Sequence, residues 1–153
     1  MIVPPEVFEL ADRAVLCWLA TADLSGAPNV SPKEAFVLLP PGTALVADIA
    51  SPKTVRNIGM NPAVCLALID VFDQRGYQLH GRARLVKPDV PAFQTFRLGI
   101  EKRIGAGYPI RQVIEIAISR VDSIIAPSYW LDPELPARDR RQRTVQRYLP
   151  ASE

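Results

Sequence analysis

The chain has 153 residues, of which 48% are hydrophobic and 22% charged, so it is long enough for one domain with a buried core. Its net charge of +2 is too small to indicate a nucleic-acid-binding protein. No apolar run reaches the roughly 18 residues of a membrane span, and the first residues lack the pattern of a secretory signal. We therefore expect a cytoplasmic protein with no nucleic-acid and no membrane partner.

The first half of the sequence predicts one helix followed by three strands. Apolar periodicity places the helix over residues 5–13 and the strands over residues 15–21, 29–39 and 43–49. Pro32 lies inside the second strand and cannot donate a hydrogen bond to a neighbouring strand. This part of the chain should therefore lie at a sheet edge or at a bulge.

A strand-to-helix corner follows the third strand. Ser51 is a preferred N-cap residue and Pro52 fits the first helical position, which predicts a helix that ends before residues 61–62. Lys53 and Thr54 fall in the first turn, where an ammonium is unfavourable unless an anion lies nearby. The corner is therefore either a phosphate site or a plain capped helix with a solvated lysine.

The second half predicts more strands and one further helix. Strands are expected over residues 63–72, 77–87 and 113–125, with a helix over residues 89–102. Asp89 is the expected N-cap of that helix. The first domain should span residues 1–131, and residues 132–153 form an Arg-rich tail that is either a short exposed helix or frayed.

Short turns join most of the predicted strands, so the sheet should be antiparallel. Six such strands favour a barrel that closes its own edges, with helices covering its mouths and sides. The predicted fold class is thus mainly β with flanking helices, built on a six-stranded antiparallel barrel.

The side chains offer no evident hydrolytic or metal chemistry. Cys17 and Cys65 each lie inside an apolar run, which indicates buried, reduced thiols and not a disulfide or metal pair. His80 is the only histidine and has no metal-ligand partner at suitable spacing, so no metal site is expected. A protein of this kind acts through a bound organic cofactor or only binds a ligand.

Four segments in order resemble the flavin-binding split-barrel family related to pyridoxamine 5'-phosphate oxidase. They are residues 19–33 (LATADLSGAPNVSPK), 45–58 (LVADIASPKTVRNI), 61–66 (NPAVCL) and 75–83 (RGYQLHGRA). The resemblance implies a split barrel that binds FMN at the interface of a homodimer. It also implies that the phosphate at the corner is the terminal group of that cofactor.

The resemblance also implies roles for individual residues. The FMN phosphate would meet Ser51, Lys53 and Thr54, with Asn57 one turn further along the same helix face. Three residues of the second strand would approach the flavin or its ribityl chain, namely Val30, Ser31 and Lys33. Asp48 and Ile49 would line the path to the phosphate. Tyr129 and Trp130 would lie near the flavin of the other subunit.

The C-terminal segment departs from the vitamin-forming oxidase. That enzyme has an Arg-Leu-His-Asp-Arg-like segment after a Trp, whereas residues 131–136 read LDPELP and the Arg-rich tail holds no histidine. We therefore do not assign formation of pyridoxal phosphate to this chain.

Three functions follow from these observations. The first is an FMN-dependent oxidoreductase in which no side chain is identified as catalytic. The second is a non-catalytic protein that holds flavin, a deazaflavin or haem as a sensor or store, with His80 as the available haem ligand. The third is a structural dimer whose site has decayed.

Overall fold

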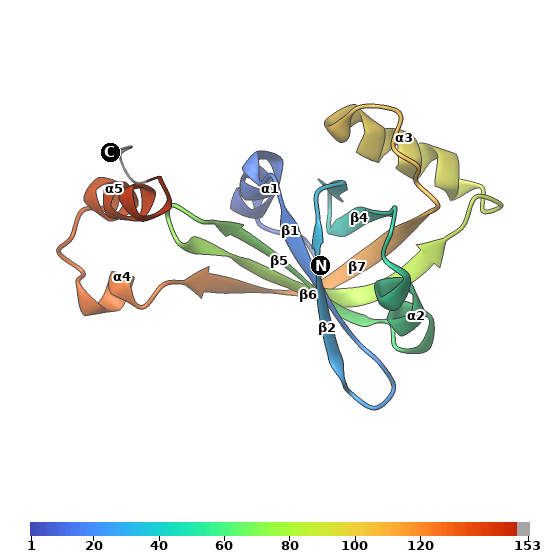
Figure 1. Cartoon of the computed structure of the whole chain (residues 1–153), viewed down its shortest axis with the longest axis horizontal. Helices are drawn as coiled ribbons and strands as arrows, with labels where there is room; N and C mark the ends of the chain where they lie inside the picture. The colour runs from blue at the N-terminus through green and yellow to red at the C-terminus, as the bar shows by residue number, and fades with distance from the viewer. Residues whose placement is uncertain (150–153) are drawn as a thin grey trace.

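The computed structural model describes residues 1–149. It contains five helices: α1 (Pro5–Arg13), α2 (Pro52–Met60), α3 (Ala92–Ile104), α4 (Ser128–Leu131) and α5 (Ala137–Tyr148). It contains seven strands: β1 (Cys17–Ala22), β2 (Pro28–Lys33), β3 (Phe36–Leu39), β4 (Thr43–Asp48), β5 (Ala63–Asp70), β6 (Arg75–Val86) and β7 (Gln112–Ile125). The fold is mainly β, as predicted (Figure 1).

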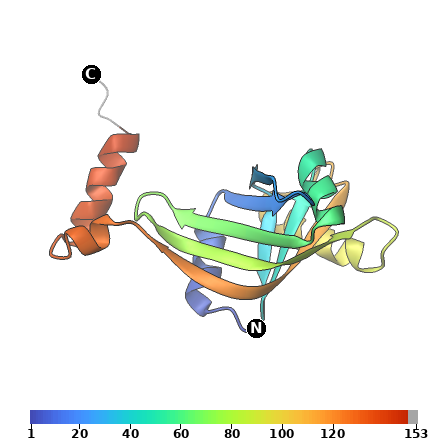
Figure 2. The same cartoon turned by 90° about the horizontal axis from the view of Figure 1, so that it is seen from below.

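All seven strands belong to one curled antiparallel sheet in the order β2-β1-β5-β6-β7-β4-β3. The curl gives a half-barrel, in which the edge strands β2 and β3 do not pair with each other (Figure 2). The prediction that the barrel closes its own edges is therefore wrong, whereas the antiparallel barrel-like architecture is confirmed.

The strand expected over residues 29–39 is in fact two strands, and this raises the count from six to seven. β2 pairs with β1, whereas β3 pairs with β4 at the opposite edge of the sheet. The chain must cross between the two edges at Glu34 and Ala35, so one continuous strand is impossible. The Ala35 carbonyl still accepts a hydrogen bond from the Ala47 N–H at 2.8 Å, which holds the crossing against β4.

Two apolar clusters stabilise the curled sheet. Inside the curl, α1 packs through Val7 and Leu10 against strand residues such as Leu66 and Phe36. On the outside, α3 covers the β4 and β7 region, which forms a separate cluster. Each fully buried Leu or Phe contributes about 1.5–3 kcal/mol through removal of apolar surface from water.

The bounds of α1 and α2 agree with the predicted ranges, whereas α3 begins later than predicted and α4 was not predicted. Asp89 was the predicted N-cap, but the helix begins at Ala92 with Pro91 in the cap position. The Val90 N–H donates to the Lys87 carbonyl at 3.0 Å, which places Asp89 inside a turn that precedes the helix. The Asp89 prediction is therefore wrong, because this turn occupies the residues expected in the first helical turn.

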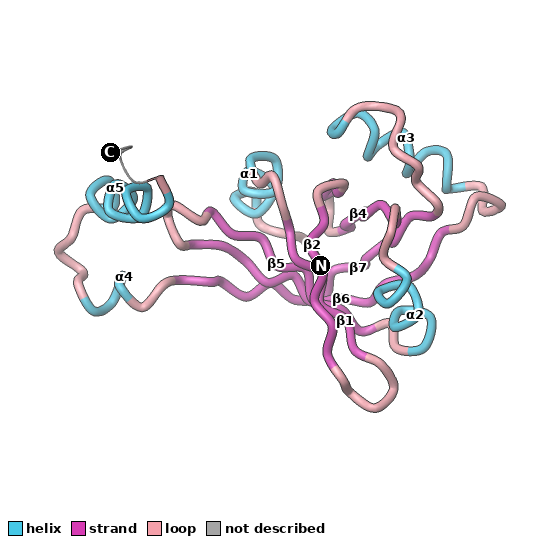
Figure 3. The backbone as a smooth tube through the Cα atoms, in the orientation of Figure 1, coloured by secondary structure: helices cyan, strands magenta, loops and turns pink. Residues whose placement is uncertain are grey.

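The strands β5, β6 and β7 extend beyond the half-barrel as an arm that carries α4 and α5 at its end (Figures 2 and 3). The Arg-rich segment therefore forms a helix, α5, which is one of the two predicted alternatives. Residues 150–153 of the predicted tail lie outside the described residues.

Gly81 provides a test of the sheet geometry. A Cβ at this position would lie 2.3 Å from the Ala117 carbonyl oxygen of β7, so Gly81→Ala should cost about 1–3 kcal/mol of stability through overpacking. Gly99→Ala in α3 is the matched control, since its Cβ would meet no atom within 4 Å and should stabilise the helix by about 0.5–1 kcal/mol. Urea unfolding measures both changes, and equal midpoints for the two variants would contradict this close approach of β6 and β7.

Candidate functional site: a cleft at the start of helix α2

A cleft of about 270 Å³ opens where β2 ends and α2 begins. Its walls include Lys33, Ile49 and Ser51, which are three of the residues predicted to contact a cofactor. Apolar side chains from other segments, such as Ile104 at the end of α3, complete the walls. The strand-to-helix corner and the polar end of β2 thus meet in one place, as the resemblance requires.

Lys33 supplies a buried ammonium to this cleft. Its side chain is only 6% exposed, and its Nζ donates a hydrogen bond to the Ser51 hydroxyl. Burial lowers the pKa of Lys33, and the nearby Asp48 carboxylate opposes that shift. A buried cation is costly unless it is paired, so this position favours an anionic or electron-rich ligand.

Asp48 fixes the geometry of the corner. Its Oδ1 accepts a hydrogen bond from the Ser51 N–H at 3.1 Å, and its Oδ2 accepts one from Gln112 Nε2 at 2.9 Å. Both carboxylate oxygens are therefore engaged by other groups. Gln112 is a member of this corner that sequence reasoning missed, because it lies 64 residues away on β7.

Ser51 is the N-cap residue of α2, as predicted, but its side chain does not make the expected capping hydrogen bond. The hydroxyl faces Lys33 instead. Among the residues that the structure describes, the backbone N–H groups of Lys53 and Thr54 have no protein acceptor. These free donors lie at the positive end of the helix dipole, which makes the start of α2 suitable for a phosphate.

A polar network joins α2 to the β1–β2 hairpin. Ser31 and Thr54 approach through their hydroxyl groups at 3.0 Å, and Asn57 Nδ2 donates to the Thr21 hydroxyl at 3.1 Å. Asn29 lies between them, 3.5 Å from both threonine hydroxyls. The network fixes the position of the start of α2 relative to β2. Thr21 and Asn29 were not predicted, although Asn29 shares the strand face of Ser31.

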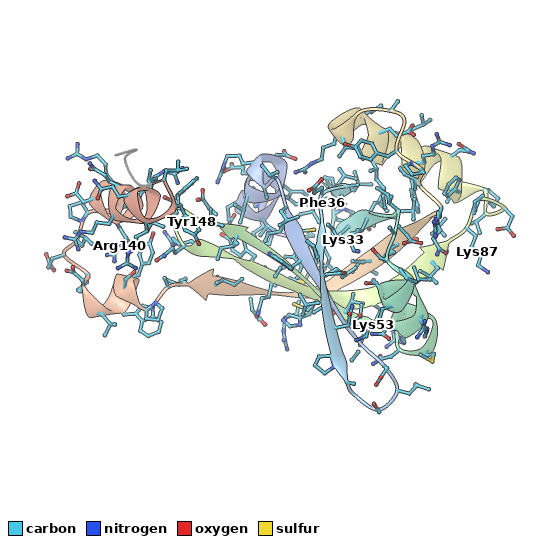
Figure 4. The ribbon with its side chains drawn as sticks, in the orientation of Figure 1. Lys33, Phe36, Lys53, Lys87, Arg140 and Tyr148 are labelled. Atoms are coloured by element: carbon cyan, nitrogen blue, oxygen red, sulfur yellow. The ribbon has the colours of Figure 1, made fainter. Side chains whose placement is uncertain are left out.

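Lys53 extends from the first turn of α2 into solvent and forms no ion pair with any residue between 1 and 149. Figure 4 shows Lys33 and Lys53 on the half-barrel, away from the arm. The two ammonium groups therefore differ, one buried and hydrogen-bonded, the other exposed and available to a ligand.

Five further predicted residues lie on the elements that meet at the corner but do not line the cleft itself, namely Ser31, Asp48, Lys53, Thr54 and Asn57. The other two lie elsewhere within one chain. Val30 projects to the opposite face of β2 from Ser31 and is 57% exposed. Trp130 belongs to α4 at the end of the arm and is 66% exposed, while its neighbour Tyr129 donates its hydroxyl to the Asp73 carbonyl at 2.7 Å. Contact of these residues with a cofactor would require a second chain and stays a prediction.

His80 has a carboxylate partner that the sequence did not reveal. Its Nε2 lies 3.1 Å from Asp122 Oδ2, because β6 and β7 are adjacent, and Arg120 Nε lies 3.0 Å from the same carboxylate oxygen. No group of three or more metal-ligating side chains is found within residues 1–149. Over the same range, no helix is long and apolar enough to cross a bilayer.

The chain belongs to the pyridoxamine 5'-phosphate oxidase family, because residues 3–125 match the family model of that description. This confirms the resemblance inferred from the four sequence segments. No curated protein matches the sequence.

Three solved structures illustrate the similarity. A HupZ variant from Group A Streptococcus is 26% identical with a TM-score of 0.69, over 81% of this chain and 100% of that chain. An F420 reductase is 25% identical with a TM-score of 0.63, over 78% and 98%. An FMN-binding protein from Syntrophomonas wolfei subsp. wolfei is 13% identical with a TM-score of 0.64, over 79% and 88%, and shows the shared split-barrel fold alone.

The thiols should be unreactive in the folded protein. Burial raises the pKa of Cys17 to about 12 and also raises the pKa of Cys65, so little thiolate is present at neutral pH. In a Cys65→Ser variant at pH 8, Cys17 should react with Ellman's reagent only after denaturation. Rapid reaction of the native variant would show that Cys17 lies in a cationic, accessible site.

Proposed function

We propose that this protein is an FMN-binding flavoprotein whose start of α2 holds the cofactor phosphate. The observation that supports this most strongly is the convergence of donors at one corner. The unpartnered N–H groups of Lys53 and Thr54 begin the helix whose N-cap residue, Ser51, accepts a hydrogen bond from the Lys33 ammonium. Membership of the pyridoxamine 5'-phosphate oxidase family supports the same cofactor.

The flavin would extend from this corner along the end of β2. Ser31 and Lys33 would approach the ribityl chain or the ring, and Asp48 and Ile49 would border the phosphate. The chain would bind and orient the cofactor, and the Lys33 ammonium would stabilise negative charge on the ring. Bound FMN supplies hydride or electron transfer, chemistry that the side chains of this site lack.

A homodimer would complete the site. The cleft of about 270 Å³ is smaller than the roughly 300–1,000 Å³ of typical ligand pockets, so one chain offers only part of a cofactor site. A second chain could contribute Trp130 or the exposed Val30 face. Both residues lie outside the cleft of their own chain, which agrees with a site at a subunit interface.

Freshly purified protein should be yellow, with flavin absorbance that is released on denaturation. Added FMN should also raise the thermal midpoint of apoprotein, since a ligand that binds only the native state stabilises it. If saturating FMN neither copurifies nor shifts the midpoint, the flavoprotein proposal fails.

Replacement of Lys53 tests the phosphate site itself. Lys53→Ala should weaken FMN binding by roughly 1.5–3 kcal/mol, the contribution of a charged hydrogen bond. Lys87→Ala is the matched control, because Lys87 is also an exposed lysine but follows β6, away from α2 (Figure 4). Fluorescence titration of FMN measures both affinities. An equal loss in the two variants would indicate a general charge effect and would argue against a phosphate at α2.

Binding of haem or a deazaflavin is the alternative. His80 is the only histidine of the chain and is partly exposed beside Asp122, although its Nε2 makes no hydrogen bond within the described residues. However, Nε2 faces the carboxylate, so haem ligation would need the other ring nitrogen or a rotated ring. The absorbance spectrum separates these cofactors, because a Soret band would indicate haem. Reduction by a deazaflavin donor alone would indicate an F420-type cofactor.

A further inference from the structure

The arm contains a second cationic pocket, separate from the cleft at α2. The family match ends at Ile125, the last residue of β7, so α4 and α5 are outside it. Figures 1 and 2 show α5 and α2 at opposite ends of the molecule. The pocket is therefore distinct from the cleft proposed to hold the FMN phosphate in the same chain.

Arg140 anchors the pocket. Its side chain is 5% exposed, and its guanidinium donates to the carbonyls of Ser128 at 2.6 Å, Asp132 at 2.8 Å and Leu135 at 3.2 Å. It also stacks 4.3 Å above the centroid of the Tyr129 ring. These contacts lock α5 onto α4, so the pocket is a built feature and not a chance approach of exposed side chains.

Three guanidinium groups share this pocket of about 170 Å³. Arg143 and Arg147 follow Arg140 by three and seven positions, which places them on the same side of α5, and all three line the pocket. The lining contains one carboxylate, Asp132, so three positive charges face one negative charge. Like charges at this spacing destabilise a helix unless an anion lies between them.

The other arginines of α5 have carboxylate partners, unlike those of the pocket. Arg138 pairs with Asp139 at 3.4 Å, and Arg141 pairs with Asp70 and Asp73 at 3.3 and 2.7 Å. Within residues 1–149, Arg143 and Arg147 form no ion pair.

Two buried donors of the pocket residues also lack partners. Arg140 Nε and the Ser128 hydroxyl have no hydrogen-bond partner among the described residues, although both residues line the pocket. Each of these orphaned donors needs an acceptor, because an unpaired polar group in a buried position is costly. A bound oxyanion would provide acceptors as well as negative charge.

We propose that this pocket binds a phosphate group. A phosphate dianion matches the two uncompensated positive charges, and its oxygens suit the planar fork of guanidinium donors. The small volume favours a single phosphate group, free or at the end of a small phosphomonoester. A run of nucleic-acid phosphates would instead need a longer cationic surface.

The test titrates inorganic phosphate into the full ¹⁵N-labelled chain, with and without added FMN, so that phosphate bound at the start of α2 is distinguished from phosphate bound in the arm. At constant ionic strength, phosphate should cause saturable amide shifts in α4 and α5 under both conditions. The double variant Arg143→Gln/Arg147→Gln should bind phosphate at least about tenfold more weakly, as expected for lost charged hydrogen bonds. Arg138→Gln is the matched control, since it removes the same charge from the same helix but lies outside the pocket lining, and its affinity should not change.

Two results would overturn the proposal. One is chloride causing the same shifts as phosphate, or Arg138→Gln weakening binding as much as the double variant, because both indicate a general charge effect. The other is a DNA duplex binding α5 more tightly than phosphate does. If the double variant unfolds, Arg147→Gln alone replaces it, and unchanged phosphate affinity in that variant would also contradict the proposal.

Discussion

The hydrogen bond from the buried Lys33 ammonium to Ser51 is the interaction on which the candidate site depends. It ties the end of β2 to the start of α2, and Asp48 fixes the same corner from β4. Because the Ser51 hydroxyl faces Lys33, it leaves the first N–H groups of α2 uncapped. The first N–H groups of a helix are commonly bonded by the side chain of the N-cap residue. In α2 they are left free for a ligand, with Lys33 and Lys53 nearby.

The half-barrel fold is what brings these residues together. β2 and β4 are not neighbours in the sheet, and they approach only because the sheet curls and the chain crosses from one edge to the other at residues 34–35. Three other strands of the half-barrel form the arm. β5, β6 and β7 continue beyond the half-barrel and carry α4 and α5 at their end (Figure 3). The cleft beside α2 and the pocket between α4 and α5 therefore lie on different parts of the chain.

Local sequence patterns were sufficient to predict most helices and strands and the strand-to-helix corner. The corner could be predicted because Ser51-Pro52 and the apolar run before it determine the local backbone within a few residues. Long-range pairing could not be predicted. The sequence contains no signal that residues 29–39 form the two opposite edge strands of the sheet, or that His80 lies beside Asp122 across adjacent strands. The pairing of Gln112 with Asp48 was hidden for the same reason. A contribution of Val30 or Trp130 to a cofactor site would need a second chain, which neither local pattern nor a single-chain structure describes.

The most direct test of the central claim is a crystal structure of the full chain grown with FMN. The account predicts the FMN phosphate within hydrogen-bond distance of the Lys53 and Thr54 N–H groups, with the flavin in a groove between two chains. A structure that places the Lys53 ammonium and these N–H groups far from any such groove, or the phosphate elsewhere, would contradict it and leave only the fold.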